Sequence, residues 1–584
     1  MDKRHEEHNG IKLNQFFATA ICGNDILSSA LYVSGIAIIF AGIYAPLVLI
    51  FVCIVLFFYK SVYTEVVEAL PINGGAYNCL LNGSSKTFAA TAGVMTILSY
   101  VATAVISGKT GIEYLTNILP VPVIPGTIVL LLAFALLVIA GIKDSAKVAL
   151  GIFGLHIVSL FGFLLLGVLY ALHGGTSHFA ENLSHTGEIL RHNNGILPTL
   201  FLAFSASLLG VSGFESSANF VEEQKKGVFR KTLRNMLIGV AIFNPLIALV
   251  ILNAMPFAAI AKSTDFLLAD AAFAIGGNIL RYIIVVDAFL VLAGAVLTAF
   301  VGVSGLIYRM SADACLPNIL TKQNSKGSFP YIVFSFFLLC SSILILTKGN
   351  LLSLAGVYTI AFLGVMTSFA IGNLLLKTTR TELKRTYSAP VLFVIFAFIS
   401  TAVGIIGNII IDPRNLLFFA YYFIPSIIIV FGVIYEDYIL DVLQRATKPF
   451  PKLHRYIQHK FDDLIKGKFI VLVHNTYRIH KILDYINRNE TGRNITLVVC
   501  RDNEQKDYDK TFREIKEILP FLRKAGIYPQ FNISLLYKNK PFGPQMIDEV
   551  SRELNIRKNR ILIGSIHKHH PYEYSELGGV RIIF

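Results

Sequence analysis

Long apolar runs separated by short polar stretches dominate the chain up to about residue 436. A helix needs about 20 apolar residues to cross the roughly 30 Å hydrocarbon core of a bilayer. Runs of that kind lie roughly at 14–41, 45–69, 87–115, 123–142, 146–172, 195–221, 232–255, 279–308, 328–347, 350–376, 388–411 and 414–436. The pattern predicts a polytopic α-helical membrane protein with about 12 transmembrane helices.

The pattern changes beyond residue 437. Residues 437–466 mix charged and apolar positions, as expected of an amphipathic connector. Short β-branched runs then predict strands at 468–474, 494–500, 531–537 and 560–566, alternating with helices at 476–488, 507–525 and 543–554. Such alternation is typical of a small α/β domain with a largely parallel sheet. We therefore expect a transmembrane domain over residues 1–436, a connector over 437–466 and a cytoplasmic α/β domain over 467–584.

Composition supports the membrane assignment. The chain is 54% hydrophobic and only 15% charged, with a mean hydropathy of +0.63, whereas soluble proteins carry about 25% charged residues. The polar N-terminus shows no cleavable signal. Six cysteines are scattered singly, so neither a disulfide framework nor a metal cluster is expected.

The formal net charge of +14 raises the question of a nucleic-acid partner. The basic residues gather instead in alternate loops. With the N-terminus inside, the inside loops hold Lys86, Lys143, Lys147, Lys225, Lys226, Arg230, Lys231, Arg234, Arg309, Lys322, Lys326, Lys377, Arg380, Lys384 and Arg385. The outside loops hold little more than Arg191, Lys262, Lys348 and Arg414. This positive-inside asymmetry places both termini in the cytoplasm at the plasma (inner) membrane, and no nucleic acid is needed to explain the charge.

The first apolar run is interrupted near its middle by CGNDILSSALY (22–32). Buried polar groups are costly in a membrane, so such stretches are candidate functional sites. Asp25 is either a packing device satisfied by neighbouring hydroxyls or, as we favour, a ligand for a cation or ammonium group, assisted by unwound backbone carbonyls. The candidate binding residues here are Gly23, Asn24, Asp25, Ser28, Ser29 and Tyr32.

The sixth run repeats this arrangement in LLGVSGFESSANFVEE (208–223). Paired interruptions in the first and sixth helices are the expected sign of a five-plus-five inverted repeat. In that design the N-termini of half-helices face an anionic substrate group, and the carbonyl ends face a cation. Leu209, Gly210 and Gly213 are therefore further candidate binding residues.

Three motifs resemble the amino acid–polyamine–organocation superfamily of permeases. PINGGAYNCL (71–80) resembles their P-x-x-G-G-x-Y signature, and GFESSANFVEE (213–223) resembles their sixth helix. SGLIYRMSADACLP (304–317) resembles the end of their eighth helix, although Ala312 stands where a second Arg is common. The resemblance covers about residues 12–436 and implies a LeuT-like fold that works by alternating access.

Within this superfamily the resemblance is divided. The first helix lacks the G-S-G-I-F type stretch of amino acid carriers, and the segment from Asp25 is closer to the D-A-L-S-S-x-A-Y pattern of bacterial potassium importers. In the third helix Tyr100, Thr103 and Ser107 match the importers' D-Y-x-x-T-x-x-x-S, but Ser99 replaces their Asp. The missing carboxylate weakens a dehydrated potassium site and favours a zwitterionic or amine-bearing substrate. Ser99, Tyr100 and Thr103 are candidate binding residues.

Two side chains are candidates for proton coupling. GIKDSAK (141–147) is similar to a motif of cationic amino acid carriers, and His156 follows in the fifth helix, where proton-coupled relatives carry a Lys in place of a sodium ion. A lone membrane His is often only a packing residue, but its ordinary pKa suits proton transfer. Glu215 is the second candidate, because a desolvated carboxyl can titrate near neutral pH. Asp287 and Tyr358 are expected to line the cavity.

The tail resembles the universal-stress-protein type of α/β domain. Nucleotide-binding members carry G-x-x-G-x-x-x-x-x-x-x-x-x-G-[ST] after the fourth strand, whereas Gly564-Ser565 is followed here by KHHPYEYSELGG, which does not fit. Dimerisation or gating is the expected role, and a nucleotide or cyclic dinucleotide ligand has little support. His567 to His570 lack a matched ligand set, so neither a metal nor a cofactor is expected.

The sequence therefore predicts a secondary transporter and not an enzyme, since it shows neither a nucleophile–base set nor a P-loop. The first hypothesis is a proton-coupled amino acid permease, with the substrate amine at Asp25 and its carboxylate at the broken first and sixth helices. The alternative is a potassium–proton symporter, and a third is a membrane sensor with the tail as output domain. The expected partners are an amino acid or cation, protons, the lipid bilayer and a second copy bound through the C-terminal domain.

Overall fold

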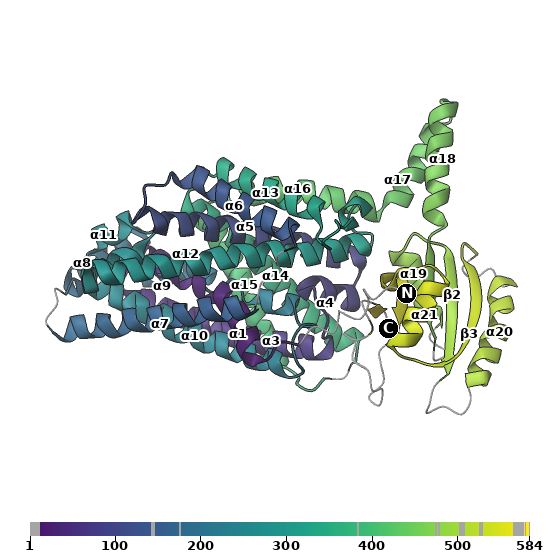
Figure 1. Ribbon diagram of the computed structural model, residues 1–584, viewed down its shortest axis with the longest axis horizontal. Helices are drawn as coiled ribbons and strands as arrows, with labels where there is room; N and C mark the ends of the chain where they lie inside the picture. Colours follow the sequence, from purple (N-terminus) through teal and green to yellow (C-terminus); the bar gives the residue numbers. More distant parts are fainter. Residues whose placement is uncertain are drawn as a thin grey trace.

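A computed structural model describes residues 12–141, 146–173, 177–381, 383, 385–473, 476, 479–501, 508–524, 529–564, 577 and 580–582. The expectations that rest on Lys143, Lys384, Ser565 and His567 to His570 lie outside these residues. Figure 1 shows a long bundle of helices, with a sheet and its covering helices standing at one end.

The helices of the bundle coincide with the predicted apolar runs. They are α1 (Gln15–Ser28), α2 (Ala30–Ala41), α3 (Ala45–Ala69), α5 (Lys86–Thr116), α6 (Val123–Ile139), α7 (Ala146–Leu172), α9 (Ile196–Ser207), the 3-10 turns η3 (Leu208–Val211) and η4 (Glu215–Asn219), α10 (Val228–Ala254), α12 (Leu267–Ala312), α13 (Pro330–Leu346), α14 (Leu351–Thr379), α15 (Val391–Ile411) and α16 (Arg414–Ile434). Three short helices, α4 (Gly75–Gly83), α8 (Phe179–His192) and α11 (Phe257–Lys262), were not predicted, because none is long enough to stand out as an apolar run.

Length and composition agree with membrane crossing. Among the described residues, nine segments are long and apolar enough to span a bilayer. The first of them, Gln15–Ala69, contains two predicted runs, and the shorter apolar helices α6 and α13 match two more. The outward side chains are apolar too: Val158, Phe161 and Leu165 of α7 are 70%, 63% and 51% exposed. Such a surface is suited to lipid rather than water.

Local sequence sets the helix ends. Asn14 accepts hydrogen bonds from the N–H groups of Phe16 (3.0 Å) and Phe17 (3.1 Å), so it caps α1. Ser85 caps α5 in the same way through the N–H of Phe88 (3.2 Å). Gly277, at φ +66°, interrupts α12, which explains why the apolar pattern predicted only the helix that follows it.

The tail forms the predicted parallel α/β unit. Its strands are β1 (Lys468–Leu472), β2 (Asn494–Arg501), β3 (Asn532–Pro541), β4 (Ile561–Ile563) and β5 (Arg581–Ile582), in the order β3-β2-β1-β4-β5. All pairs are parallel. The helices are α19 (Ile479–Asn489), α20 (Tyr508–Lys524) and α21 (Pro544–Glu553). β1 is buried along Phe469–Leu472, as a central strand covered on both faces must be. β5 was not predicted.

The connector is a helical hairpin. α17 (Glu436–Ala446) continues from α16, and α18 (Pro451–Ile465) folds back against it before β1 begins. Figure 1 shows the hairpin projecting from the rest of the molecule. The unit that follows therefore meets the bundle through other contacts, made at the ends of α5 and α12.

Candidate functional site

The sixth helix is unwound in its middle. α9 ends at Ser207, Ser212 is extended (φ −60°, ψ 147°) and Gly213 has φ +89° before η4 begins. A side chain at position 213 would place its Cβ 2.8 Å from Cγ of Asp25 and 3.0 Å from the backbone nitrogen of Ile26. Glycine is therefore required here both for the left-handed backbone and for the close approach to α1.

The first helix is interrupted much less. Ser29, between α1 and α2, keeps helical angles (φ −63°, ψ −24°). The hydroxyl of Ser28 donates to the carbonyl of Asp25 (2.7 Å), and that of Ser29 donates to the carbonyls of Ile26 (2.6 Å) and Gly210 (3.0 Å). These hydroxyls satisfy local carbonyls without opening the backbone. The expectation of unwound carbonyls is thus right for the sixth helix and wrong for the first.

Asp25 lies buried against the unwound segment. It is 6% exposed, and the hydroxyl of Ser216 donates to its Oδ2 (2.5 Å). Within the described part of the chain, no Lys, Arg or His forms an ion pair with it. A buried carboxylate is costly unless a positive charge or several donors compensate it. The Asp25 carboxylate therefore needs a cation, an ammonium group or a proton.

A second carboxyl group reaches the same break. Glu215 is 6% exposed, and its Oε2 accepts from the backbone N–H of Gly213 (3.1 Å). Its Oε1 accepts from the hydroxyl of Ser99 on α5 (3.2 Å). Like Asp25, it has no basic partner among the described residues. Two acidic side chains thus converge at Gly213, and Glu215 occupies the backbone N–H that an anionic substrate group would otherwise find there.

Hydroxyl groups from neighbouring helices complete this region. Thr103 of α5 donates to the hydroxyl oxygen of Tyr358 on α14 (2.6 Å). Asn219 donates to the hydroxyl oxygen of Tyr100 (2.6 Å). Tyr32 is buried as well, at 3% exposure. The predicted residues from the third helix are therefore joined by hydrogen bonds to α14 and η4.

Other predicted residues face neighbouring helices. A Cβ at Gly23 would lie 2.3 Å from the ring of Phe153 on α7, and the amide of Asn24 donates to the carbonyl of Ala149 (2.9 Å). These two residues pack α1 against α7. Gly210 offers its carbonyl to Ser29, and Leu209 is fully buried.

His156 pairs with Asp287, a contact that sequence reasoning missed. Its Nδ1 lies 2.8 Å from Oδ2 of Asp287, and both side chains are fully buried. Its Nε2 lies 3.3 Å from the carbonyl oxygen of Leu27, just before the interruption of the first helix. Which ring nitrogen donates in these two contacts depends on the tautomer of His156. The geometry therefore marks the buried pair as a place where an imidazole and a carboxyl group can exchange or share a proton.

The next question is whether the described residues could hold a metal ion or a nucleotide. Within the described residues, no group of three His, Cys, Asp or Glu side chains is placed to hold a metal ion. The loops that follow β1 and β4, where a nucleotide binds in parallel sheets, contain residues 474–475 and 565–576, which lie outside the described part.

Comparison with known proteins assigns the bundle. The sequence profile of the amino acid permease family matches residues 13–434, from the start of α1 to the end of α16. The chain belongs to this amino acid permease family. The predicted superfamily is thereby confirmed, and the chain is an integral membrane protein of a transporter family. The family match stops before the connector, so it says nothing about the tail.

Two similar proteins carry names that state a substrate. The potassium transporter KimA of Bacillus subtilis is 25% identical over 354 residues, 58% of this chain and 57% of that protein. The branched-chain amino acid permease BcaP of the same organism is 22% identical over 352 residues, 56% of this chain and 72% of that protein. The matched region thus spans little more than half the length of KimA. Among solved structures, a mutant of the Eremococcus coleocola manganese transporter matches 77% of this chain and 95% of its own, with a TM-score of 0.47 and 9% identity.

Proposed function

We propose that this chain is a proton-coupled amino acid permease that takes up its substrate across the inner membrane by alternating access. The observation that carries the proposal is the buried Asp25 carboxylate, which lies against the unwound backbone at Gly213 and has no basic partner among the described residues. Family membership and the similarity to BcaP support an amino acid as the substrate.

The two carboxyl groups have different roles in this proposal. Asp25 receives the substrate ammonium group, which supplies the positive charge that the site lacks. Glu215 holds the N–H of Gly213 in the absence of substrate. When Glu215 takes up a proton it gives up its charge, and the substrate carboxylate replaces it at that N–H. The remaining candidates, Ser99, Tyr100, Thr103 and Tyr358, surround the substrate with hydroxyl groups.

The His156–Asp287 pair is the second proton site in the proposal. Both side chains are buried beside the Leu27 carbonyl, so a proton bound by the pair is shielded from water in this conformation. Movement of the first helix during the transport cycle would remove that carbonyl and admit water, so the proton could leave toward the cytoplasm. This arrangement links proton release to movement of the helix that carries Asp25.

The orientation is also a proposal. The α/β unit stands at the end of the bundle where α5 begins and α12 ends, and the basic loops assigned to the inside include Lys86 and Arg309. The positive-inside rule then supports cytoplasmic termini. All described cysteines are buried, so a cysteine introduced at the exposed Lys448 should be labelled only from the cytoplasmic side. Labelling from the opposite side would show that the proposed orientation is wrong.

A homodimer formed through the C-terminal part is supported by the connector hairpin. Tyr438, Phe450 and Tyr456 there are 68%, 64% and 68% exposed. Large exposed apolar side chains on a projecting element are typical of contact surfaces. Native mass spectrometry of the detergent-solubilised protein would show a dimer, and a monomer at all concentrations would exclude it.

One set of observations favours a second function, potassium–proton symport. Several oxygen-bearing side chains gather in this region: two carboxyl groups and the hydroxyls of Ser99, Ser216, Thr103 and Tyr358. Oxygen ligands are what a hard monovalent cation needs, and KimA is named a potassium transporter.

Uptake into proteoliposomes separates the two functions. Vesicles that are more acidic outside than inside are given either labelled amino acids or a potassium analogue, with Asp25→Asn as the matched inactive variant. The proposal predicts pH-driven accumulation of at least one amino acid by the wild type and none by Asp25→Asn. Accumulation of the potassium analogue alone would replace it with the second function.

A further inference from the structure

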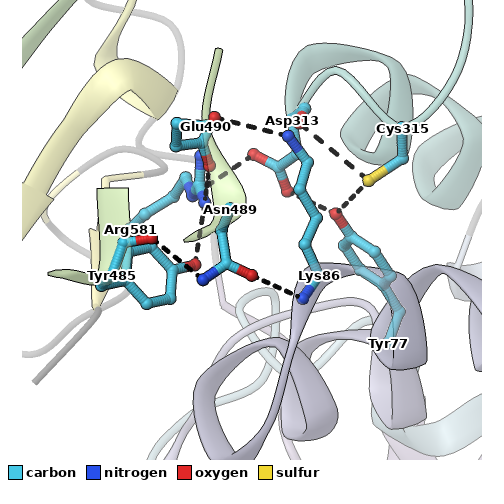
Figure 2. A network of polar contacts seen from close by, with 8 residues as sticks. All are labelled: Tyr77, Lys86, Asp313, Cys315, Tyr485, Asn489, Glu490 and Arg581. Atoms are coloured by element: carbon cyan, nitrogen blue, oxygen red, sulfur yellow. Dashed lines mark hydrogen bonds and ion pairs between the residues drawn. The ribbon is translucent and has the colours of Figure 1, made fainter. Parts of the chain in front are cut away.

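Four buried charged groups join the α/β unit to the membrane bundle. Figure 2 shows them: Glu490 and Arg581 come from the tail, Lys86 lies at the start of α5, and Asp313 directly follows α12. All four side chains are at most 5% exposed. Arg581 Nη2 lies 2.6 Å from Oε1 of Glu490, Lys86 Nζ lies 3.4 Å from its Oε2, and Arg581 Nε lies 3.8 Å from Oδ1 of Asp313.

Neutral groups fix the geometry of this contact. The backbone N–H of Lys86 donates to Oδ1 of Asn489 (3.0 Å), so a residue of the tail helps to cap α5. Arg581 also donates to the hydroxyl oxygen of Tyr485 (3.0 Å). Burial by itself would raise the pKa of Glu490, but the charges of Arg581 and Lys86 hold that pKa below its ordinary value of 4.5. The carboxyl group is therefore ionised and paired at neutral pH.

The network extends from Asp313 into α4. The hydroxyl of Tyr77, on α4, donates to Oδ2 of Asp313 (2.8 Å) and lies 3.5 Å from Sγ of Cys315 (Figure 2). Arg581 approaches the other oxygen of the same carboxylate. Arg581 of β5 thus contacts the same Asp313 carboxylate that accepts the hydrogen bond from α4.

The N-terminal end of α4, which carries Tyr77, is also joined to both broken helices. Asn73, just before α4, accepts from the backbone N–H of Glu222 (3.0 Å) and donates to the carboxylate of Glu223 (3.1 Å). Glu222 and Glu223 follow η4, the inner part of the broken sixth helix. The N–H of Leu13, at the start of the first helix, donates to the carbonyl of Glu223 (2.7 Å). α4 therefore bridges the tail's docking point and the inner ends of the helices that carry Asp25 and Glu215.

The contact has room to open. A cavity of about 410 Å³ lies beside it, lined by Lys86, Asp313, Glu490 and Arg581 among others. Arg581 Nε and Asp313 Oδ1 face each other without a direct hydrogen bond. A buried charge pair with imperfect geometry is weak evidence for stability, because desolvation offsets much of the attraction. Such a contact is better suited to forming and breaking than to permanent attachment.

We propose that the α/β unit is an intramolecular brake: Arg581 orients Asp313 so that Tyr77 holds α4, and α4 restrains the inner ends of the first and sixth helices. Undocking of the tail releases Asp313, loosens α4 and speeds the opening of the cytoplasmic side. The described elements form a continuous set of packed and hydrogen-bonded groups from β5 to Gly213, which is the physical requirement for such coupling.

Hydrogen exchange of the full-length protein tests the brake without any transport measurement. Arg581→Gln should increase amide exchange in α4 (residues 75–83) and at the α19 docking face. Tyr77→Phe, which cuts the link beyond the docking contact, should increase exchange in α4 alone. Arg488→Gln is the matched control, because Arg488 lies in α19 with a 73% exposed side chain that pairs with Asp484. Unchanged exchange in α4 for both variants, with a folded protein, would overturn the brake.

The uptake rate then tests whether the brake slows transport. This measurement, unlike hydrogen exchange, rests on the proposed transport function. Arg581→Gln and Tyr77→Phe should each raise the maximal uptake rate by at least about fivefold, the lower end of usual coupling between sites, with KM unchanged. Arg581→Lys, which keeps the charge, should restore most of the wild-type rate. Faster exchange in α4 with an unchanged uptake rate would overturn the brake, whereas a protein that transports nothing while the exchange changes occur would count against the proposed function instead.

Discussion

The central membrane site and the cytoplasmic contact are both built from buried charges, but their charges are balanced differently. At the contact, Glu490 has two cationic neighbours, Lys86 and Arg581. At Gly213, within the described residues, Asp25 and Glu215 have none and rely on hydroxyl and backbone donors. Buried charges that lack a counter-charge are retained only where a ligand or proton supplies it. The difference separates a site that needs a ligand or proton from a contact that joins two parts of the chain.

In the His156–Asp287 pair, one carboxyl group has one partner that can carry a positive charge. Breaking this pair should have the largest effect on transport. His156→Gln leaves Asp287 buried without a counter-charge, and loss of one partner of a buried pair costs about 3–5 kcal/mol. The free energy of unfolding should fall by up to that amount. Because the proposed proton site is lost, we expect pH-driven accumulation to be abolished, while substrate exchange without a pH gradient continues. Uptake assays with and without the gradient measure this.

A histidine directly after the end of the same helix, α7, serves as the control position. His173 is exposed, and its Nδ1 lies 2.8 Å from the Leu169 carbonyl, so His173→Gln should transport like the wild type. Equal accumulation by His156→Gln and the wild type would remove the pair from the coupling mechanism.

Much of this comparison could be anticipated from the sequence. Asp25, Gly213 and Glu215 were identifiable because polar residues and glycines inside apolar runs are rare and costly. The apolar runs themselves follow from bilayer thickness, which fixes the length of a spanning helix.

What the sequence could not supply were contacts between distant elements. Nothing near His156 indicates that Asp287, on another helix, is its partner. Arg581 lies in a two-residue strand, too short for a periodic signal, although the terminal RIIF is rich in β-branched residues. The small break at Ser29 was also overestimated, because serine hydroxyls can satisfy carbonyls within an intact helix.

A substitution at Gly213 tests the close approach of the two helices at the central membrane site. The left-handed backbone there costs a non-glycine residue about 1–2 kcal/mol, and the added Cβ would lie 2.8 Å from Cγ of Asp25. We expect Gly213→Ala to lower the uptake rate about tenfold. Gly151→Ala on α7, where a Cβ meets nothing within 4 Å, should have no effect. Wild-type uptake by Gly213→Ala would contradict the close approach of the two helices.

The smallest effect is expected from pH at the cytoplasmic contact. The pKa of Glu490 lies below its ordinary value of 4.5 in the folded protein. Its contribution to docking is therefore complete above that value and is lost only as the pH falls through the lower, folded-state pKa. The protection of α19, which is its hydrogen exchange relative to the intrinsic rate at each pH, should stay constant between about pH 8 and pH 6, a range far above both values, while uptake changes strongly. Undocking within that range would show that the contact is itself pH-sensitive.

The unpaired Asp25 carboxylate is the centre of the account, and ligand binding tests it most directly. Thermal unfolding of the purified protein is followed with and without a saturating amino acid chosen from the uptake screen, for the wild type and for Asp25→Asn. A ligand that binds only the folded protein raises its melting temperature. The account predicts a clear rise for the wild type and none for Asp25→Asn, which should be folded and at least as stable without ligand. An equal rise in both proteins would contradict the assignment of Asp25 as the group that receives the substrate's positive charge.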